Sequence, residues 1–275
     1  SDMKSGLAVM AFVLGELAES GCVPQKTIVF AGTCDEERGG LGAKEIIKEY
    51  PDLFPELLLI GEPTSCQAGV AQKGCIWLKL SVSGKTSHGA EPWQGINALE
   101  QGFGLLADLR EELKREEHPV LGHSTLQITM AEGGIAPNMT PDRAKFLADI
   151  RIVPPLNEKE VLNRLECLMQ KRCEVYNGGL AFVPEITNYR MPVETGPENQ
   201  WLHRLKGFIG DDEGETGINY FTDASILLTA WPDSPALLFG PGEPQMCHKP
   251  NEYVEISKYL EAIRVMEKFC WYIAK

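Results

Sequence analysis

The sequence predicts an α/β domain, a mixed sheet flanked by helices, with a smaller α+β domain inserted into it. Two short apolar segments, Thr27–Phe30 and Leu57–Ile60, are typical of buried strands. A helix fits the residues between them, Ala43 to Tyr50, and ends before Pro51. Because each strand is followed at once by acidic residues, we expect a site at the ends of the strands.

The pattern of the chain changes at about Cys75, where apolar and polar residues begin to alternate as in a half-exposed strand. The expected order from there is strand, helix, strand, strand, helix, strand, which is the split βαβ pattern of a small α+β domain. These elements are expected at Ile76–Val82, Ile96–Glu112, Thr125–Met130, Ala144–Val153, Glu158–Arg172 and Leu180–Thr187. We therefore divide the chain into residues 1–74, an insertion at 75–188, and residues 189–275, where the α/β domain resumes.

The first and last parts contain further helices. Gly6 to Ser20 is apolar nearly all round, which predicts a buried helix. After Pro192 we expect elements at Trp201–Ile209, Tyr220–Trp231, Ala236–Phe239 and Ile256–Ala274. Ser1 leads straight into the first helix without an initiator methionine, so we expect a further segment to precede it.

Composition excludes several classes of partner. The formal net charge of −13 disfavours binding to nucleic acid or to anionic membranes. No apolar run is long enough to span a membrane, and no signal-peptide pattern is present. The eight cysteines are scattered without a close CxxC pair, which indicates reduced thiols and a cytoplasmic location.

Three adjacent acids, Asp35, Glu36 and Glu37, follow the first predicted strand. Neighbouring carboxylates repel one another, and a divalent metal ion would compensate that repulsion. One carboxylate can then bind the metal while its neighbour handles the proton of a water molecule. The alternative is a solvated acidic turn before a helix, where acids suit the helix dipole.

Other polar residues at strand ends or in Gly/Pro loops extend this candidate site. Carboxylates and imidazoles are good zinc ligands, and a catalytic zinc keeps one position open. For Asp2, an ordinary helix N-cap is the alternative. The candidates are Asp2, Glu36, Glu37, Glu62, His88 and His248.

Short motifs along the whole chain resemble those of the co-catalytic di-zinc metallopeptidases and amidohydrolases. This family includes aminoacylase, acetylornithine deacetylase, succinyl-diaminopimelate desuccinylase and glutamate carboxypeptidase. Each motif is weak alone, but together and in this order they are specific. The matching segments are Ser1–Gly6, Asp35–Glu37, Gly61–Thr64, Gly84–Gly89, Asp149–Arg151, Thr222–Asp223 and Gly240–Glu252.

The resemblance implies a role for each candidate at the metals. Asp2 would bridge two zinc ions, and its bond to Met3 would be a cis peptide. Glu37 and His248 would complete one metal site, and Glu62 would be the terminal ligand of the other. Glu36 would be the general base.

The resemblance also places functional residues in the inserted domain, which would act as a lid and a dimerisation domain. His88 would reach the active site of a partner subunit and stabilise the oxyanion; the alternative is a surface loop histidine. Asn138 and Arg151 would grip a substrate carboxylate, a bidentate task that suits a guanidinium. A solvated strand residue is the alternative for Arg151. Thr222 matches a substrate-binding loop.

One motif of this family, a His-x-Asp upstream of Asp2, does not occur in the sequence. In the family that histidine shares the second metal with Glu62. We therefore expect the second zinc site to be incomplete in this chain. Cobalt or manganese are possible substitutes for zinc.

The implied activity is zinc-dependent hydrolysis of the amide bond of an N-acyl amino acid or small peptide with a free carboxylate. A hydroxide bridging the metals would attack, with Glu36 as its base. The expected assembly is a homodimer through the inserted domain. The alternative is a non-catalytic relative that serves as a binding or dimerisation module.

Overall fold

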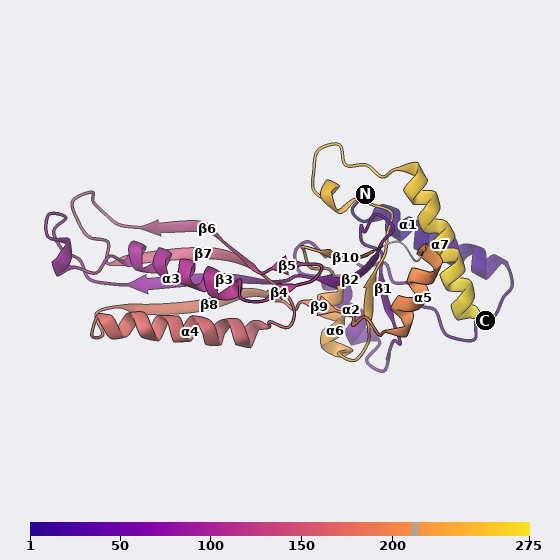
Figure 1. Ribbon diagram of the computed structural model, residues 1–275, viewed down its shortest axis with the longest axis horizontal. Helices are drawn as coiled ribbons and strands as arrows, with labels where there is room; N and C mark the ends of the chain where they lie inside the picture. Colours follow the sequence, from indigo (N-terminus) through magenta and orange to yellow (C-terminus); the bar gives the residue numbers. More distant parts are fainter. Residues whose placement is uncertain (211–213) are drawn as a thin grey trace. The chain divides into compact units, whose positions relative to one another are not determined.

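The computed structural model describes residues 1–210 and 214–275, which form two compact units (Figure 1). Unit 1 comprises residues 1–72 and 193–275, and unit 2 comprises residues 73–192. The sequence placed the insertion at 75–188, so the observed unit starts two residues earlier and ends four residues later. Among the described residues, no helix is both long enough and apolar enough to cross a membrane.

Unit 1 is built on a mixed sheet in the order β1-β11-β2-β10, with β9 also paired to β2. β1 is parallel to β11 and β10 is parallel to β2, whereas β2 is antiparallel to both β11 and β9. The strands are β1 (Leu58–Ile60), β2 (Ala68–Gln72), β9 (Val193–Glu194), β10 (Glu215–Ile218) and β11 (Ala236–Leu238).

Two groups of helices pack around this sheet. Helices α1, α5 and α7 pack together, and α2 packs with α6 (Figure 1). Apolar residues of α2 and α6 form a small core with Leu58 and Ile60 of β1. The helices are α1 (Lys4–Glu19), α2 (Leu41–Glu49), α5 (Gln200–Ile209), α6 (Ala224–Ala230) and α7 (Ile256–Ala274), with a 3₁₀ turn η2 (Pro244–Met246) before α7.

Unit 2 is a four-stranded antiparallel sheet in the order β6-β7-β3-β8, with helices α3 and α4 forming a core with it. Residues of β7 alternate between buried and less buried positions, as expected for a sheet with one covered face. A separate two-stranded hairpin, β4-β5, lies between α3 and β6 in the sequence. The elements are β3 (Gly74–Ser83), η1 (Pro92–Gln94), α3 (Ala98–Leu113), β4 (Glu117–His118), β5 (Gly122–His123), β6 (Thr125–Gly133), β7 (Arg143–Ile152), α4 (Glu158–Val175) and β8 (Ala181–Arg190).

The predicted fold class is confirmed, including the split βαβ order of β3, α3, β6, β7, α4 and β8. One predicted strand is wrong: Thr27–Phe30 forms no strand, and Val29 and Phe30 are 62% and 44% exposed. A strand needs a neighbour to pair with, and among the described residues no strand pairs with this segment. The apolar composition of this segment predicts a strand, but it does not provide a second strand for it to pair with.

Helix α1 also differs from expectation, because only one face of it is buried. Val9, Val13 and Leu17 recur at the four-residue spacing of a helix face and are buried, whereas Phe12 is 48% exposed. The apolar sequence predicted burial all round. Within unit 1, neighbouring elements such as α7 cover only one face of α1.

Candidate metal centre

Asp2, Glu37 and His248 come together in unit 1 although they lie far apart in the sequence. His248 Nε2 is 2.7 Å from Glu37 Oε1 and 3.2 Å from Asp2 Oδ2. One ligand atom from each residue lies within 4.8 Å of the other two. Two carboxylate oxygens and one imidazole nitrogen form a donor set that suits zinc.

Close packing sets Asp2 against the end of β1. Asp2 lies two residues before the start of α1. Gly6, in the first turn of that helix, meets the backbone of Gly61, directly after β1. A Cβ atom at Gly6 would stand 1.8 Å from the Gly61 carbonyl oxygen, so only glycine allows this approach. The Asp2–Met3 peptide bond is cis, as the resemblance implied.

Glu37 and His248 are carried by loops. The turn that presents Glu37 is closed by the Asp35 carbonyl, which accepts the N–H groups of Arg38, Gly39 and Gly40. Asp35 itself has a φ of 66°, in the left-handed region. His248 also lies in that region, with a φ of 59°, in the loop between η2 and α7. Neither side chain is positioned by a regular helix or strand.

Glu62, directly after Gly61, supplies a buried carboxyl group beside this cluster. Burial, followed by the charges of Asp2, Glu36 and Asp223, raises its pKa to about 9. Its Oε2 atom is buried and accepts no hydrogen bond from the described residues. A buried carboxyl oxygen without a donor, among other carboxylates, fits a site completed by a cation.

The pKa shifts of Asp2 and His248 also fit a cation site. Burial raises the pKa of Asp2, and the Glu37 and Glu252 carboxylates add to that effect while His248 opposes it. The hydrogen bond to Glu37 raises the pKa of His248. The His248 shift arises because its imidazole lies close to the Glu37 and Asp2 carboxyl groups. The residues present fit a divalent cation held by Asp2, Glu37 and His248, with Glu62 nearby.

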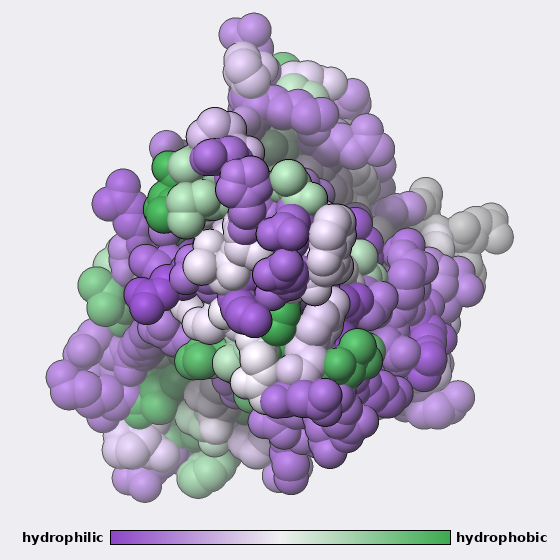
Figure 2. All heavy atoms as spheres, turned by 90° about the vertical axis from the view of Figure 1, so that its left-hand side faces the viewer, coloured by the Kyte–Doolittle hydropathy of each residue, from purple (hydrophilic) through white to green (hydrophobic). Residues whose placement is uncertain are grey.

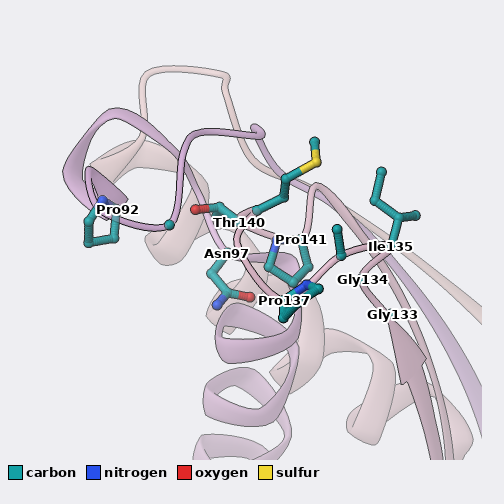
Figure 3. Close-up of a pocket in the computed structure, with 11 residues that line it drawn as sticks. Pro92, Asn97, Gly133, Gly134, Ile135, Pro137, Thr140 and Pro141 are labelled. Carbon is teal, nitrogen blue, oxygen red and sulfur yellow. The ribbon is translucent and has the colours of Figure 1, made fainter.

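His88 and Asn138 lie next to each other in unit 2. The Gly89 N–H donates to the Asn138 carbonyl oxygen at 2.7 Å, and His88 forms an isolated β-bridge with Met139. Their side chains are exposed at the end of the sheet where β3 ends and β7 begins. A groove of about 610 Å³ beside them is lined by Pro92, Asn97, Gly133–Pro137 and Met139–Pro141 together with Gly89 (Figure 3).

Arg151 lies at the opposite end of the same sheet. It pairs with Cys75 at the start of β3, whereas Arg143 pairs with Ser83 at the end of that strand. The strand from Arg143 to Arg151 spans about 27 Å, so Asn138 and Arg151 of one chain cannot hold one small carboxylate together. The guanidinium forms a two-point ion pair with Asp149 at 2.7 and 3.0 Å.

Thr222 is buried in unit 1, and its hydroxyl group is engaged within the fold. It donates to Gln72 Oε1 at 2.6 Å and accepts the Ala224 N–H at 3.1 Å, at the start of α6. This placement ties β2 to α6. Substrate contact by Thr222 stays a prediction.

Two residues near the cluster had no assigned role in the sequence analysis. Asp223 lies close enough to Glu62 for its charge to raise the pKa of that carboxyl group. Glu252 accepts the backbone N–H of Asp2. Both residues belong to segments that carried the family resemblance. Neither the charge effect of Asp223 nor the backbone contact of Glu252 leaves a spacing pattern in the sequence.

Comparison with known proteins agrees with this fold. Residues 70–177 match the model of the M20 family's peptidase dimerisation domain. Acetylornithine deacetylase of Shigella sonnei (strain Ss046) is 29% identical over 287 aligned residues, which cover 99% of this chain and 71% of that protein.

Solved structures share the fold at lower identity. Aminopeptidase PepT from Bacillus cereus ATCC 10987 is 20% identical with a TM-score of 0.77, covering 99% of this chain and 71% of that one. The M20 family metallo-carboxypeptidase Sso-CP2 from Sulfolobus solfataricus is 16% identical with a TM-score of 0.66, covering 98% and 75%.

Proposed function

This chain is a homologue of the M20 peptidases, and from that premise we propose that it is a metal-dependent hydrolase of amide bonds. The substrate class is an N-acyl amino acid or a small peptide with a free carboxylate, as the name of the acetylornithine deacetylase relative suggests. The observation that carries the proposal is the cluster of Asp2, Glu37 and His248, whose ligand atoms lie within 4.8 Å of one another. A protein that only bound a partner would not need this arrangement.

Zinc held by Asp2, Glu37 and His248 would supply Lewis-acid chemistry at the scissile carbonyl and favour ionisation of water. Glu36, next to the ligand Glu37 in the chain, is half-buried, and its charge reaches Glu62. In the proposed reaction the Glu36 carboxylate takes a proton from the attacking water and returns it to the leaving amine.

His88, Asn138 and Arg151 are proposed to act on the substrate. An imidazole N–H of His88 would donate to the oxygen that becomes negative in the transition state. Arg151 would bind the substrate carboxylate with its planar fork, and Asp149 would orient that fork. Because His88 and Asn138 lie at the far end of the sheet from Arg151, we propose that they serve the site of a second copy.

The proposed homodimer is formed through unit 2. Strand β6 is an edge of the sheet, has no proline and packs beside α3, whereas the other edge strand, β8, contains Pro184. Met130 on β6 and Phe103 on α3 are 63% and 45% exposed. An apolar edge strand with a helix beside it suits pairing with a second copy.

The activity is tested by measuring bound zinc and hydrolysis of N-acetyl and N-succinyl amino acids and of dipeptides. Glu36→Gln is expected to lower kcat by about 10²–10⁴-fold, because a proton acceptor is lost while the proposed ligands stay. Its zinc content should match that of the unaltered protein. Glu45→Gln, on the exposed face of α2, is the matched control and should retain full activity.

Two results would count against the proposal. Activity of Glu36→Gln equal to that of the unaltered protein would contradict the role of Glu36 as the general base. A protein that binds no zinc and hydrolyses none of these substrates would favour a non-catalytic binding or dimerisation module.

A further inference from the structure

The proposed ligands depend on contacts outside the cluster for their positions. Asp2 precedes a helix, and His248 lies in a loop with left-handed backbone. Their two segments are separated by more than 240 residues of chain. They meet at His248 Nε2 and Asp2 Oδ2, which lie 3.2 Å apart, and at a hydrogen bond between the Cys247 and Asp2 side chains. An imidazole and a carboxylate that both favour a cation do not by themselves keep a fixed separation.

Glu252 links these two segments. It lies four residues after His248, in the same loop between η2 and α7. Its Oε1 atom accepts the Asp2 N–H at 2.5 Å and lies 2.8 Å from the backbone nitrogen of Ser1. A carboxylate of the loop that carries His248 therefore receives donors from the segment that carries Asp2.

The Glu252 carboxylate is not itself placed to bind an ion with the others. Within the part of the chain that the structure describes, the group of side chains close enough to share an ion comprises Asp2, Glu37 and His248. Glu252 instead faces backbone donors, and its side chain is 25% exposed. Hydrogen bonds from N–H groups to a carboxylate are roughly twice as strong as neutral ones, so they suit a holding role.

We propose that Glu252 is a positioning residue that fixes the separation of the Asp2 carboxylate and the His248 imidazole, because it binds the Asp2 backbone from the loop that carries His248. The inference rests on the metal centre of the proposed function. It assigns Glu252 no contact with substrate and no bond to the metal. Its expected effect is on the affinity and geometry of the metal site, in the range of about 10–100-fold for a residue that orients ligands.

The test uses the full chain with Glu252→Gln and Glu252→Ala. Glutamine keeps one acceptor oxygen at the same distance, whereas alanine removes both. Glu255→Gln is the matched control, since Glu255 lies three residues later and its carboxylate accepts a hydrogen bond from the Ser257 hydroxyl group. The readouts are the zinc dissociation constant against a chelator, the visible spectrum of the Co²⁺ form, and exchange of the Asp2 amide proton in metal-free protein.

We expect zinc affinity to fall about 10–100-fold in Glu252→Ala and by less in Glu252→Gln, with an altered Co²⁺ spectrum. The amide of Asp2 should lose protection in Glu252→Ala, and Glu255→Gln should match the unaltered protein. Unchanged affinity, spectrum and protection in Glu252→Ala would overturn the inference while leaving the metal centre intact. Should Glu252→Ala fail to fold, Glu252→Gln decides by the same readouts. Failure of the unaltered protein to bind zinc or Co²⁺ would instead overturn the proposed function.

Discussion

At the scale of single residues, two carboxyl groups define the site, because burial raises the pKa of both Asp2 and Glu62. Glu62 is 6% exposed, and its Oε2 atom finds no donor among the described residues. Its pKa of about 9 follows first from burial and then from the charges of neighbouring acids. A bound cation would offset the free-energy cost of ionising buried Glu62. That cost can therefore be measured in metal-free protein.

The metal-free protein should lose stability as pH rises from about 4.5 to about 9, because folded Glu62 keeps its proton over that range while the unfolded residue has released it. Glu62→Gln should flatten this dependence. Urea unfolding in the presence of a chelator at several pH values measures it. Glu56→Gln, which alters an exposed glutamate paired with Lys26, is the control and should keep the slope. Equal slopes in Glu62→Gln and the unaltered protein would contradict the assignment.

At the scale of elements, the metal centre depends on how closely α1 approaches the end of β1. Gly6 and Gly61 meet backbone to backbone, and this contact holds Asp2 beside Glu62. Gly15, on the exposed face of the same helix, has open space around it. Substitutions at Gly6 and Gly15 therefore distinguish the effect of close packing from the effect of helix propensity.

Gly6→Ala should destabilise the protein by about 1–3 kcal/mol, because the new methyl group overlaps the Gly61 carbonyl. It should also weaken zinc binding, since Asp2 moves with the start of α1. Gly15→Ala should instead stabilise by roughly 0.5–1 kcal/mol through the lower backbone entropy of alanine. Urea unfolding and zinc titration of both variants test this. Normal zinc affinity in Gly6→Ala would show that the contact does not position Asp2.

At the scale of the whole molecule, the proposed functional residues are divided between two units. Asp2, Glu36 and His248 belong to unit 1, and His88 and Asn138 belong to unit 2. Apolar residues are exposed among polar ones on the face that Figure 2 shows. Ile135, which lines the groove beside His88, is 84% exposed. Exposed apolar residues beside the loop that carries His88 suit contact with another chain.

A dimer with shared sites predicts complementation between inactive variants. His88→Ala and Glu36→Gln should each be nearly inactive alone. After the two are mixed, unfolded and refolded together, about a quarter of the sites should contain both an intact Glu36 and a partner's intact histidine, so activity should return to about that fraction. No recovery would indicate that His88 serves its own chain or has no catalytic role.

The interface itself is tested by charge substitution. Phe103→Glu and Met130→Glu place a charge in the proposed apolar contact of α3 and β6, so they should raise the dimer dissociation constant by at least about tenfold. Val183→Glu, on the opposite edge strand β8 and 64% exposed, is the control. Analytical ultracentrifugation measures the assembly. Dissociation by the control alone would place the interface at β8.

Unit 2 was the more predictable part of the fold. Its strands alternate apolar and polar residues, and Asn157 and Glu160 form a capping box at the start of α4, so the pattern of each element is local. The central strand β2 of unit 1 was missed, because Ala68–Gln72 combines small residues of low strand propensity. Its burial comes from neighbours on both sides, which no local pattern records.

The residue types at the site and the alternation of strands and helices are properties of the chain itself, and they were sufficient to predict the α/β fold and its inserted domain. Only the tertiary structure decided that Asp2, Glu37 and His248 meet, and that Arg151 lies far from Asn138. Periodicity describes which side of an element is buried, but the distance between residues hundreds of positions apart depends on packing. At this site that packing is the contact of Gly6 with Gly61 and the hydrogen bond that Glu252 accepts from the Asp2 backbone.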